Sequence, residues 1–180
     1  MLIQTTRLDL IPGTALMLEA ELIGRAAVQE QLGVTVPEDW PPPLFDARAV
    51  EWALARLRES DAFGNWGFRY FVLRKGSGGA GAVAVGAGGY KGAPADGAVE
   101  VSYSVLPEFQ RRGFATEAAG GLAERAFEDE RVDRVIAETL PELIPSIGVL
   151  VKLGFRCVGQ GSEEGAVRYQ LDRPRPEMLN

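Results

Sequence analysis

The feature that most constrains the fold is a change in the spacing of apolar residues near Trp66. Between a first short strand at 2–11 and this point, the apolar residues recur at helical spacing, over 14–33 and again after Asp46. After it, alternating segments typical of strands begin, and helical spacing returns only twice. The expected strands cover 2–11, 66–74, 82–90, 99–106, 132–139, 155–159 and 166–171, and the later helices cover 114–129 and 146–153. This order predicts a mixed α/β sheet rather than a regular alternation of strands and helices.

The length of the chain favours one domain. With 180 residues the chain can bury a substantial core without a metal or a disulfide, and two full domains would be cramped. We therefore treat 1–180 as a single domain, with 174–180 as a frayed tail. Three prolines at 41–43 exclude a helix from 34–45, which is expected to be a stiff extended connection.

The composition excludes several kinds of active site. The sequence has no histidine, so a histidine general base, a Ser-His-Asp triad and an imidazole zinc site are excluded. The single cysteine, Cys157, cannot form an intrachain disulfide, and its apolar neighbours on an expected strand predict a buried, unreactive residue. A net charge of −6 argues against nucleic-acid binding. The N-terminal residues lack the pattern of a signal peptide, and we expect a cytoplasmic protein that uses neither a metal nor a membrane.

The glycine-rich segment Gly76–Gly81 matches the G-x-G-x-x-G pattern of dinucleotide sites. That pattern binds a pyrophosphate only where a helix follows it, and here strand-forming residues follow. We interpret the segment as a hairpin turn, and a nucleotide-binding module based on it is a minor alternative.

A second segment, Gln110-Arg111-Arg112-Gly113-Phe114-Ala115, has the context that phosphate binding requires, because it follows a strand and opens a helix. The free amides and the positive dipole end of a first helical turn suit a pyrophosphate, and Gly113 lets the backbone approach it closely. Arg111 and Arg112 add positive charge in an acidic protein. The alternative is a basic loop before an ordinary helix.

Four segments of the chain carry a family resemblance. Gln110-x-x-Gly113-x-Ala115, followed by Thr116-Glu117-Ala118, resembles the acetyl-coenzyme A signature of the GNAT N-acetyltransferases. The other three resemble the branch of that family that acetylates the N-terminal alanine or serine of ribosomal proteins: Thr6-Arg7-Leu8-x-Leu10, Glu100-Val-Ser-Tyr103-Ser-Val-Leu-Pro, and Pro145-Ser146-Ile147 through Gly154-Phe155. Their order and spacing over nearly the whole chain make the resemblance specific.

The resemblance implies a single-domain GNAT fold, with a twisted, mostly antiparallel sheet that splays between its fourth and fifth strands, 99–106 and 132–139. It also implies acetyl-CoA as co-substrate, whose pantetheine arm pairs with the open backbone at Val105 and Leu106. The pyrophosphate is then expected on the loop and helix start, formed by Gln110, Arg111, Arg112, Gly113, Phe114, Ala115 and Thr116.

For catalysis, the resemblance assigns Ser146 as the proton donor to the departing thiolate. The branch usually carries Asn at the position of Leu143, and other branches carry a Tyr acid at the position of Leu150, so neither role transfers to this chain. The alternative for Ser146 is an N-cap, since Pro145-Ser146 stands at a predicted helix start.

A general base is expected among the carboxylates, because the attacking amine must be neutral. Glu100 is one candidate, since a carboxylate on a central strand is costly to bury without a purpose; its alternative is a salt bridge to Lys91 or Arg156. The second candidate is Glu164, in the Glu163-Glu164 pair between the last two expected strands, where the branch carries a base nearby. The alternative there is a solvated turn.

These observations predict an enzyme that transfers the acetyl group of acetyl-CoA directly to a primary amine in a ternary complex. The acceptor is left open between a protein N-terminus and a small amine such as a polyamine or an aminoglycoside, and the acidic balance favours a cationic acceptor. Glycines at 86, 88 and 89 are expected to leave room for it. The rival interpretation is a non-catalytic acyl-CoA sensor, and whether the chain forms a homodimer is open.

Overall fold

A mixed sheet crosses the molecule in the computed structural model, which describes residues 1–76 and 81–174. Within these residues the strands lie in the order β1 (Ile3–Gln4), β2 (Leu8–Pro12), β3 (Phe68–Leu73), β4 (Val83–Tyr90), β5 (Ala98–Val105), β6 (Arg134–Thr139), β8 (Val167–Asp172) and β7 (Arg156–Gln160). Among the strands of the described residues, only β5 and β6 are parallel neighbours, and the other neighbouring pairs are antiparallel. The predicted mixed, mostly antiparallel α/β fold is confirmed.

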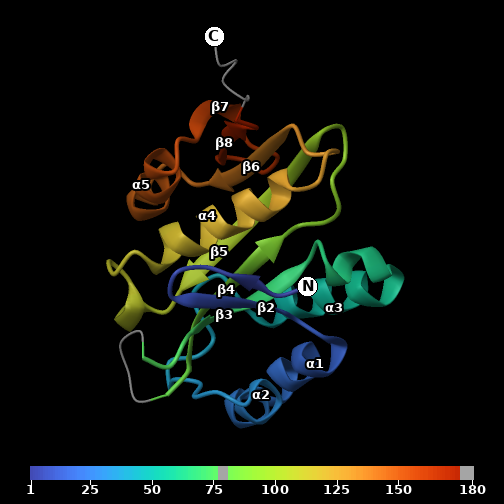
Figure 1. The fold of residues 1–180 in the computed structure, drawn as a ribbon, viewed down its shortest axis with the longest axis vertical. Helices are drawn as coiled ribbons and strands as arrows, with labels where there is room; N and C mark the ends of the chain where they lie inside the picture. The colour runs from blue at the N-terminus through green and yellow to red at the C-terminus, as the bar shows by residue number, and fades with distance from the viewer. Residues whose placement is uncertain (77–80, 175–180) are drawn as a thin grey trace.

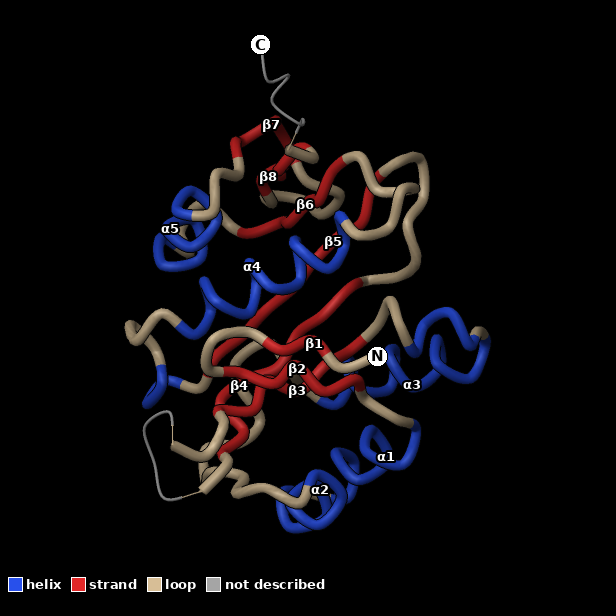
Figure 2. Tube along the Cα trace, in the orientation of Figure 1, coloured by secondary structure: helices blue, strands red, loops and turns tan. Residues whose placement is uncertain are grey.

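Helices cover both faces of this sheet. They are α1 (Ala15–Ile23), α2 (Arg25–Leu32), α3 (Ala47–Glu59), α4 (Phe114–Phe127) and α5 (Ile144–Lys152), with short 3-10 turns η1 (Asp61–Gly64) and η2 (Pro107–Phe109). In Figure 1, α1 and α2 lie at one end of the molecule, β7 and β8 lie at the other, and α4 crosses between them. Figure 2 shows α1 and α2 on one side of β1–β4 and α4 on the other. Helix α3 shares a hydrophobic cluster with α1 and α2, and α5 packs with α4.

The N-terminal segment differs from the single strand predicted over 2–11. It forms a hairpin of β1 and β2, in which the Thr5 N–H donates to the Leu8 carbonyl (2.9 Å). The Arg74 side chain donates to the carbonyls of Thr5 and Thr6 and so satisfies the backbone of the turn. The turn depends on a side chain far away in the sequence, and local alternation therefore gives no sign of it.

The helical pattern predicted over 14–33 is also divided, into α1 and α2. The break lies at Gly24, whose φ of 136° and ψ of 175° are far from helical values. Helix α3 begins after Asp46, whose carboxylate caps it by accepting a hydrogen bond from the Ala49 N–H (3.0 Å).

Two hydrophobic clusters pack on opposite faces of the sheet. Phe71 and Leu73 of β3 join the cluster under α4, whereas Tyr70 and Val72 join the cluster under α1, α2 and α3. Because both faces of β3 are covered, all six of its residues are buried. The sheet between these clusters is a rigid support for the loops at its edge.

The sheet opens between β5 and β6. The two strands pair at Ala98–Arg134, Val99–Val135 and Glu100–Ile136, and the pairing then ends although both strands continue. The later residues of β5 and β6 therefore diverge, as the predicted splay between 99–106 and 132–139 requires.

The C-terminal strands confirm the predicted elements but correct one residue. Cys157 is exposed, because β7 is the outer strand of the sheet and all five of its residues are exposed. The predicted turn at Gly76–Gly81 and the predicted tail 174–180 lie mostly outside the described residues. Within the described part of the chain, no helix combines the length and the apolar character needed to cross a membrane.

Candidate functional site

The loop between β5 and α4 has two residues in the left-handed conformation. Arg111 has a φ of 60° and Gly113 a φ of 83°. Gly113 is the N-cap of α4 and provides no side chain to bond the first turn. The first intrahelical hydrogen bond runs from the Glu117 N–H to the Gly113 carbonyl (3.0 Å), so the amides of 114–116 have no acceptor within the helix. These amides, at the positive end of the helix dipole, suit an anion.

Side chains hold the loop against the end of β5. Gln110 Nε2 donates to the Val105 carbonyl (2.9 Å). The guanidinium of Arg112 lies over the rings of Phe109 and Phe114, at 5.5 and 5.2 Å from their centroids. Phe114 is itself buried, with 2% exposure, so it can offer a ligand only its backbone. The residues predicted to bind the pyrophosphate, from Gln110 to Thr116, thus lie together in one loop and one helical turn.

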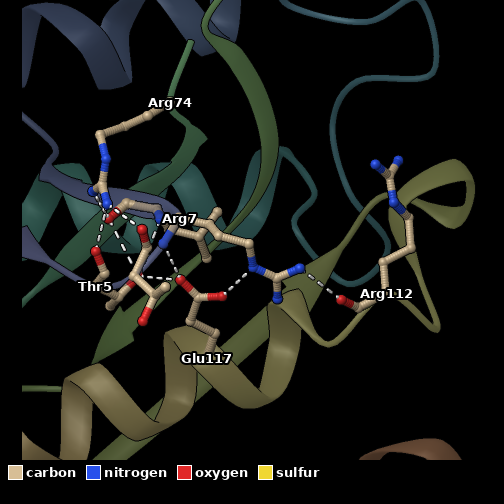
Figure 3. A network of polar contacts seen from close by, with 7 residues as sticks. Thr5, Arg7, Arg74, Arg112 and Glu117 are labelled. Atoms are coloured by element: carbon tan, nitrogen blue, oxygen red, sulfur yellow. Dashed lines mark hydrogen bonds and ion pairs between the residues drawn. The ribbon is translucent and has the colours of Figure 1, made fainter. Parts of the chain in front are cut away.

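The first turn of α4 is joined to the N-terminal hairpin by a polar network, drawn in Figure 3. Glu117 accepts hydrogen bonds from the Thr5 hydroxyl (2.6 Å) and from Arg7 Nε (2.7 Å), and Arg7 Nη1 donates to the Arg112 carbonyl (3.1 Å). Burial raises the pKa of the Glu117 carboxyl, but the hydrogen bonds from Thr5 and Arg7 outweigh it, and the net pKa is lowered. Glu117 is therefore a charged carboxylate beside the candidate anion site.

The backbone of β5 borders the gap between β5 and β6. The prediction that Leu106 pairs with a pantetheine arm there is wrong. The Leu106 N–H donates to the Val85 carbonyl (2.9 Å), and the Leu106 carbonyl accepts from the Phe109 N–H (2.9 Å). Leu106 therefore has no open backbone group for a pantetheine arm. Since hydrogen bonding alternates along an antiparallel strand, Tyr103 and Val105 face the other way, toward the gap. The Val105 carbonyl already accepts from Gln110 Nε2, so Val105 offers a pantetheine arm only its N–H.

Tyr103 brings a hydroxyl group to this gap, next to Ser146 of α5. Its Oη lies 3.3 Å from Ser146 Oγ and 3.2 Å from the Ser146 carbonyl oxygen. Burial raises the pKa of Tyr103, and the hydrogen bond with Ser146 offsets this only in part. The sequence presents Tyr103 only as a core or groove aromatic, because the partner that its hydroxyl meets lies in a distant helix.

The start of α5 overturns the alternative role of Ser146. The helix begins at Ile144, two residues before the predicted start, and its N-cap is Leu143, whose side chain forms no capping hydrogen bond. Ser146 therefore lies inside the first turn and is not an N-cap. Its hydroxyl instead contacts Tyr103 at the gap.

Glu100 points away from Tyr103 and Ser146. Side chains alternate along a strand, so Glu100 and Tyr103 lie on opposite faces of β5. The Glu100 carboxylate pairs with Lys91 Nζ, and its side chain is 19% exposed. Of the two salt-bridge partners predicted for Glu100, Lys91 is the correct one, because Arg156 pairs with Asp172 (2.5 Å).

Glu164 lies in an exposed turn between β7 and β8. A carboxylate that the sequence analysis missed, Glu138 of β6, anchors this turn: it accepts from Ser162 Oγ (2.7 Å) and Arg168 Nε (2.8 Å), and its side chain is 5% exposed. Burial raises the pKa of Glu138, whereas the bonds from Ser162 and Arg168 lower it, and the net pKa is lowered. Glu138 is thus suited to holding the turn rather than to accepting a proton. The sequence does offer a signal for Glu138, because this carboxylate stands inside a predicted strand, between Ala137 and Thr139.

The glycines of β4 do not leave the space that was predicted. A Cβ at Gly86 would lie 2.3 Å from the Ser104 carbonyl oxygen, and one at Gly88 would lie 2.2 Å from that of Ser102. These glycines instead allow β4 and β5 to approach closely.

A pocket of about 470 Å³ lies between the 35–39 segment and η2, and it is lined by Thr35, Pro37, Glu38, Asp39, Val83, Glu108 and Phe109. Its three carboxylates suit a cationic group better than a phosphate. No cluster of three or more metal-ligating side chains occurs within 1–76 and 81–174.

Comparison with known proteins identifies the family. Residues 15–156 match the model of the acetyltransferase (GNAT) domain. The chain belongs to the GNAT acetyltransferase family. This confirms the family predicted from the four sequence segments.

Individual relatives agree with the family assignment. The chain is 35% identical over 71 residues to the uncharacterized N-acetyltransferase YnaD of Bacillus subtilis (strain 168), which covers 36% of this chain and 42% of that protein. The chain thus spans less than half the length of this curated relative. A putative GNAT-family acetyltransferase from Bordetella pertussis has a similar structure, with a TM-score of 0.64, 23% identity and coverage of 97% and 99% of the two chains. RimL, a ribosomal α-N-protein acetyltransferase solved in complex with coenzyme A, has a TM-score of 0.60, 14% identity and coverage of 96% and 98%.

Proposed function

We propose that this GNAT protein transfers the acetyl group of acetyl-CoA to a primary amine by direct attack in a ternary complex. One observation carries the proposal: the free amides at the start of α4 and the open backbone edge of β5 lie at the same end of the gap between β5 and β6. A pyrophosphate on the helix start and a pantetheine arm along Tyr103 and Val105 fit this arrangement. RimL, which has a similar fold, was solved in complex with coenzyme A.

The proposed reaction forms one bond and breaks one. The neutral amine nitrogen attacks the carbonyl carbon of the thioester, the carbon–sulfur bond breaks, and the sulfur leaves as a thiolate. A carboxylate, Glu100 or Glu164, takes the proton lost by the amine through a bridging water, since Glu100 lies on the face of β5 opposite Ser146. The Ser146 hydroxyl protonates the thiolate and regains a proton from solvent. Positioning of the two substrates supplies most of the rate enhancement.

The acceptor that we propose is a cationic amine, either a protein N-terminus or a small polyamine-like molecule. The net charge of −6 and the carboxylates of Glu38, Asp39 and Glu108 support this charge preference. An α-amine, with an ordinary pKa of about 7.7–8.0, needs less help from a base than a lysine amine at about 10.4.

The test is thiol release from acetyl-CoA across a panel of N-terminal peptides, polyamines and aminoglycosides. Turnover with one class identifies the acceptor. If acetyl-CoA binds but no amine in the panel accelerates thiol release, the chain is better described as an acyl-CoA sensor. If acetyl-CoA does not bind, the proposal fails.

The identity of the base gives a separate prediction. If Glu100 is the base, Glu100→Gln lowers kcat/KM by about 10²-fold or more, because an amide cannot accept the proton. The loss is steepest at low pH, where the acceptor amine is mostly protonated. Glu164→Gln is the comparison variant, since it makes the same change at the second candidate base, in an exposed turn. A large loss in Glu164→Gln with a mild one in Glu100→Gln assigns the base to the turn, and small, equal losses contradict both assignments.

A further inference from the structure

The side chain of Arg7 connects the N-terminal hairpin to the candidate coenzyme loop and helix by three separate contacts, and the Arg7 backbone N–H also donates to Glu117 Oε1 (2.5 Å). Its Nε donates to Glu117 Oε2 (2.7 Å), and its Nη1 donates to the Arg112 carbonyl (3.1 Å). Its guanidinium carbon also lies 4.4 Å from the ring centroid of Phe114. One planar side chain thus joins the loop, the first turn of α4 and the hairpin (Figure 3).

The second amino group of Arg7 reaches the glycine at the helix start. A Cβ built on Gly113 would lie 3.3 Å from Arg7 Nη2. The guanidinium therefore lies directly beside the residue whose left-handed φ of 83° sets the direction of the loop. Movement of Arg112 or Gly113 away from their present positions would break the contact with Nη1 or open a gap beside Nη2.

Arg7 also neutralises a charge that would oppose anion binding. The Glu117 carboxylate belongs to the first turn of α4 and is only 14% exposed. Without a cationic partner, this carboxylate would repel a pyrophosphate bound to the same turn, weakly screened because it is largely buried. Thr5 also donates to Glu117 but carries no charge.

We propose that Arg7 is a positioning residue for the coenzyme: it holds Arg112 and Gly113 in the pyrophosphate-binding conformation and neutralises Glu117. This inference rests on the coenzyme site proposed above. It makes the N-terminal hairpin, which is distant from the loop in sequence, part of the coenzyme site.

The experiment measures the Kd of coenzyme A by calorimetry, together with the thermal midpoint of each variant. Arg7→Met should weaken binding by about 10-fold, equivalent to about 1.4 kcal/mol. Arg7→Lys should weaken it by less, because lysine keeps the positive charge beside Glu117 but cannot bond Glu117 and the Arg112 carbonyl as a planar fork does. In kinetics, KM for acetyl-CoA should rise about as much as Kd, with a much smaller change in kcat.

Arg74→Gln is the matched control. Arg74 supports the same hairpin turn, through the carbonyls of Thr5 and Thr6 and a salt bridge to Asp9 (2.9 Å), so these contacts lie in the hairpin and not in the coenzyme loop. This variant should lower the thermal midpoint. Its Kd should stay within about two-fold of the original value, well below the change of about 10-fold expected for Arg7→Met.

The outcomes separate the inference from the proposed function. Arg7 variants that bind coenzyme A as tightly as the original protein overturn the inference and leave the proposed function intact. An equal loss of affinity in Arg74→Gln also overturns it, because general loosening of the hairpin would then be the cause. If Arg7→Met does not fold, Arg7→Lys gives the deciding Kd. An original protein that does not bind coenzyme A overturns both proposals.

Discussion

Replacing Gly113 by valine is expected to lower coenzyme A affinity by about 100-fold or more, a loss of about 2.7 kcal/mol, while the chain stays folded. Gly113 has a φ of 83°, which a β-branched residue adopts only with strain of about 1–3 kcal/mol. Its Cβ would also lie 3.3 Å from Arg7 Nη2, so the valine methyl groups must displace Arg7 or cover the amides that face the pyrophosphate. Calorimetry with coenzyme A measures the loss.

Gly33→Val is the control for this substitution. Gly33 has a similar left-handed φ of 66°, and a Cβ there would meet nothing within 4 Å. The control should share the backbone strain and lower the thermal midpoint, but it should leave coenzyme affinity unchanged. Tight binding by Gly113→Val would show that the pyrophosphate lies elsewhere.

Replacing Ser146 by alanine is expected to lower kcat by about 10²-fold, the low end of the range for general acid catalysis. The low end applies because the thiol of coenzyme A has an ordinary pKa of about 8.5, so its thiolate can leave without an acid at a modest cost. Affinity for acetyl-CoA should not change. Because Ser146 is not the N-cap of α5, the variant should also escape the loss of about 0.5–2 kcal/mol that follows removal of a cap.

Tyr103→Phe tests whether the acid is Ser146 or its neighbour. The two hydroxyl groups lie 3.3 Å apart, so either oxygen could pass a proton to the sulfur. If Ser146 is the acid, Tyr103→Phe should cost only a few-fold in kcat, far below the 10²-fold effect. A larger loss in Tyr103→Phe than in Ser146→Ala would assign the proton to the tyrosine. Normal turnover in both variants would mean that the thiolate leaves without an acid.

The sequence predicts those elements whose residues decide their own conformation. Six strands, from β3 to β8, lie within two residues of their predicted ends, because alternation of apolar residues reports the strand period directly. Alternation of apolar residues does not show whether other elements pack over a strand and bury its side chains. Cys157 alternates with apolar neighbours as a buried residue would, yet β7 is an edge strand and the residue is exposed.

The sequence predicts those parts of the candidate site whose residues are close together in the chain. The strand, the glycine loop and the helix start follow one another in sequence, and their spacing is sufficient to locate them. The contacts of Tyr103 with Ser146 and of Arg7 with Glu117 join residues 43 and 110 positions apart. No periodic pattern links such distant positions, although all four residues lie in segments that carry the family resemblance.

The gap between β5 and β6 has a consequence for the stability of the protein. Three residue pairs link the two strands, and beyond them the backbone of β5 has lost its neighbour on that side. A pantetheine arm with its amides along this edge would act as a missing strand and complete the sheet. Coenzyme at 100 times its Kd would then add about 2.7 kcal/mol to the free energy of unfolding. The thermal midpoint of the protein should therefore rise with the concentration of acetyl-CoA, so that the co-substrate stabilises the fold as well as supplying the acetyl group.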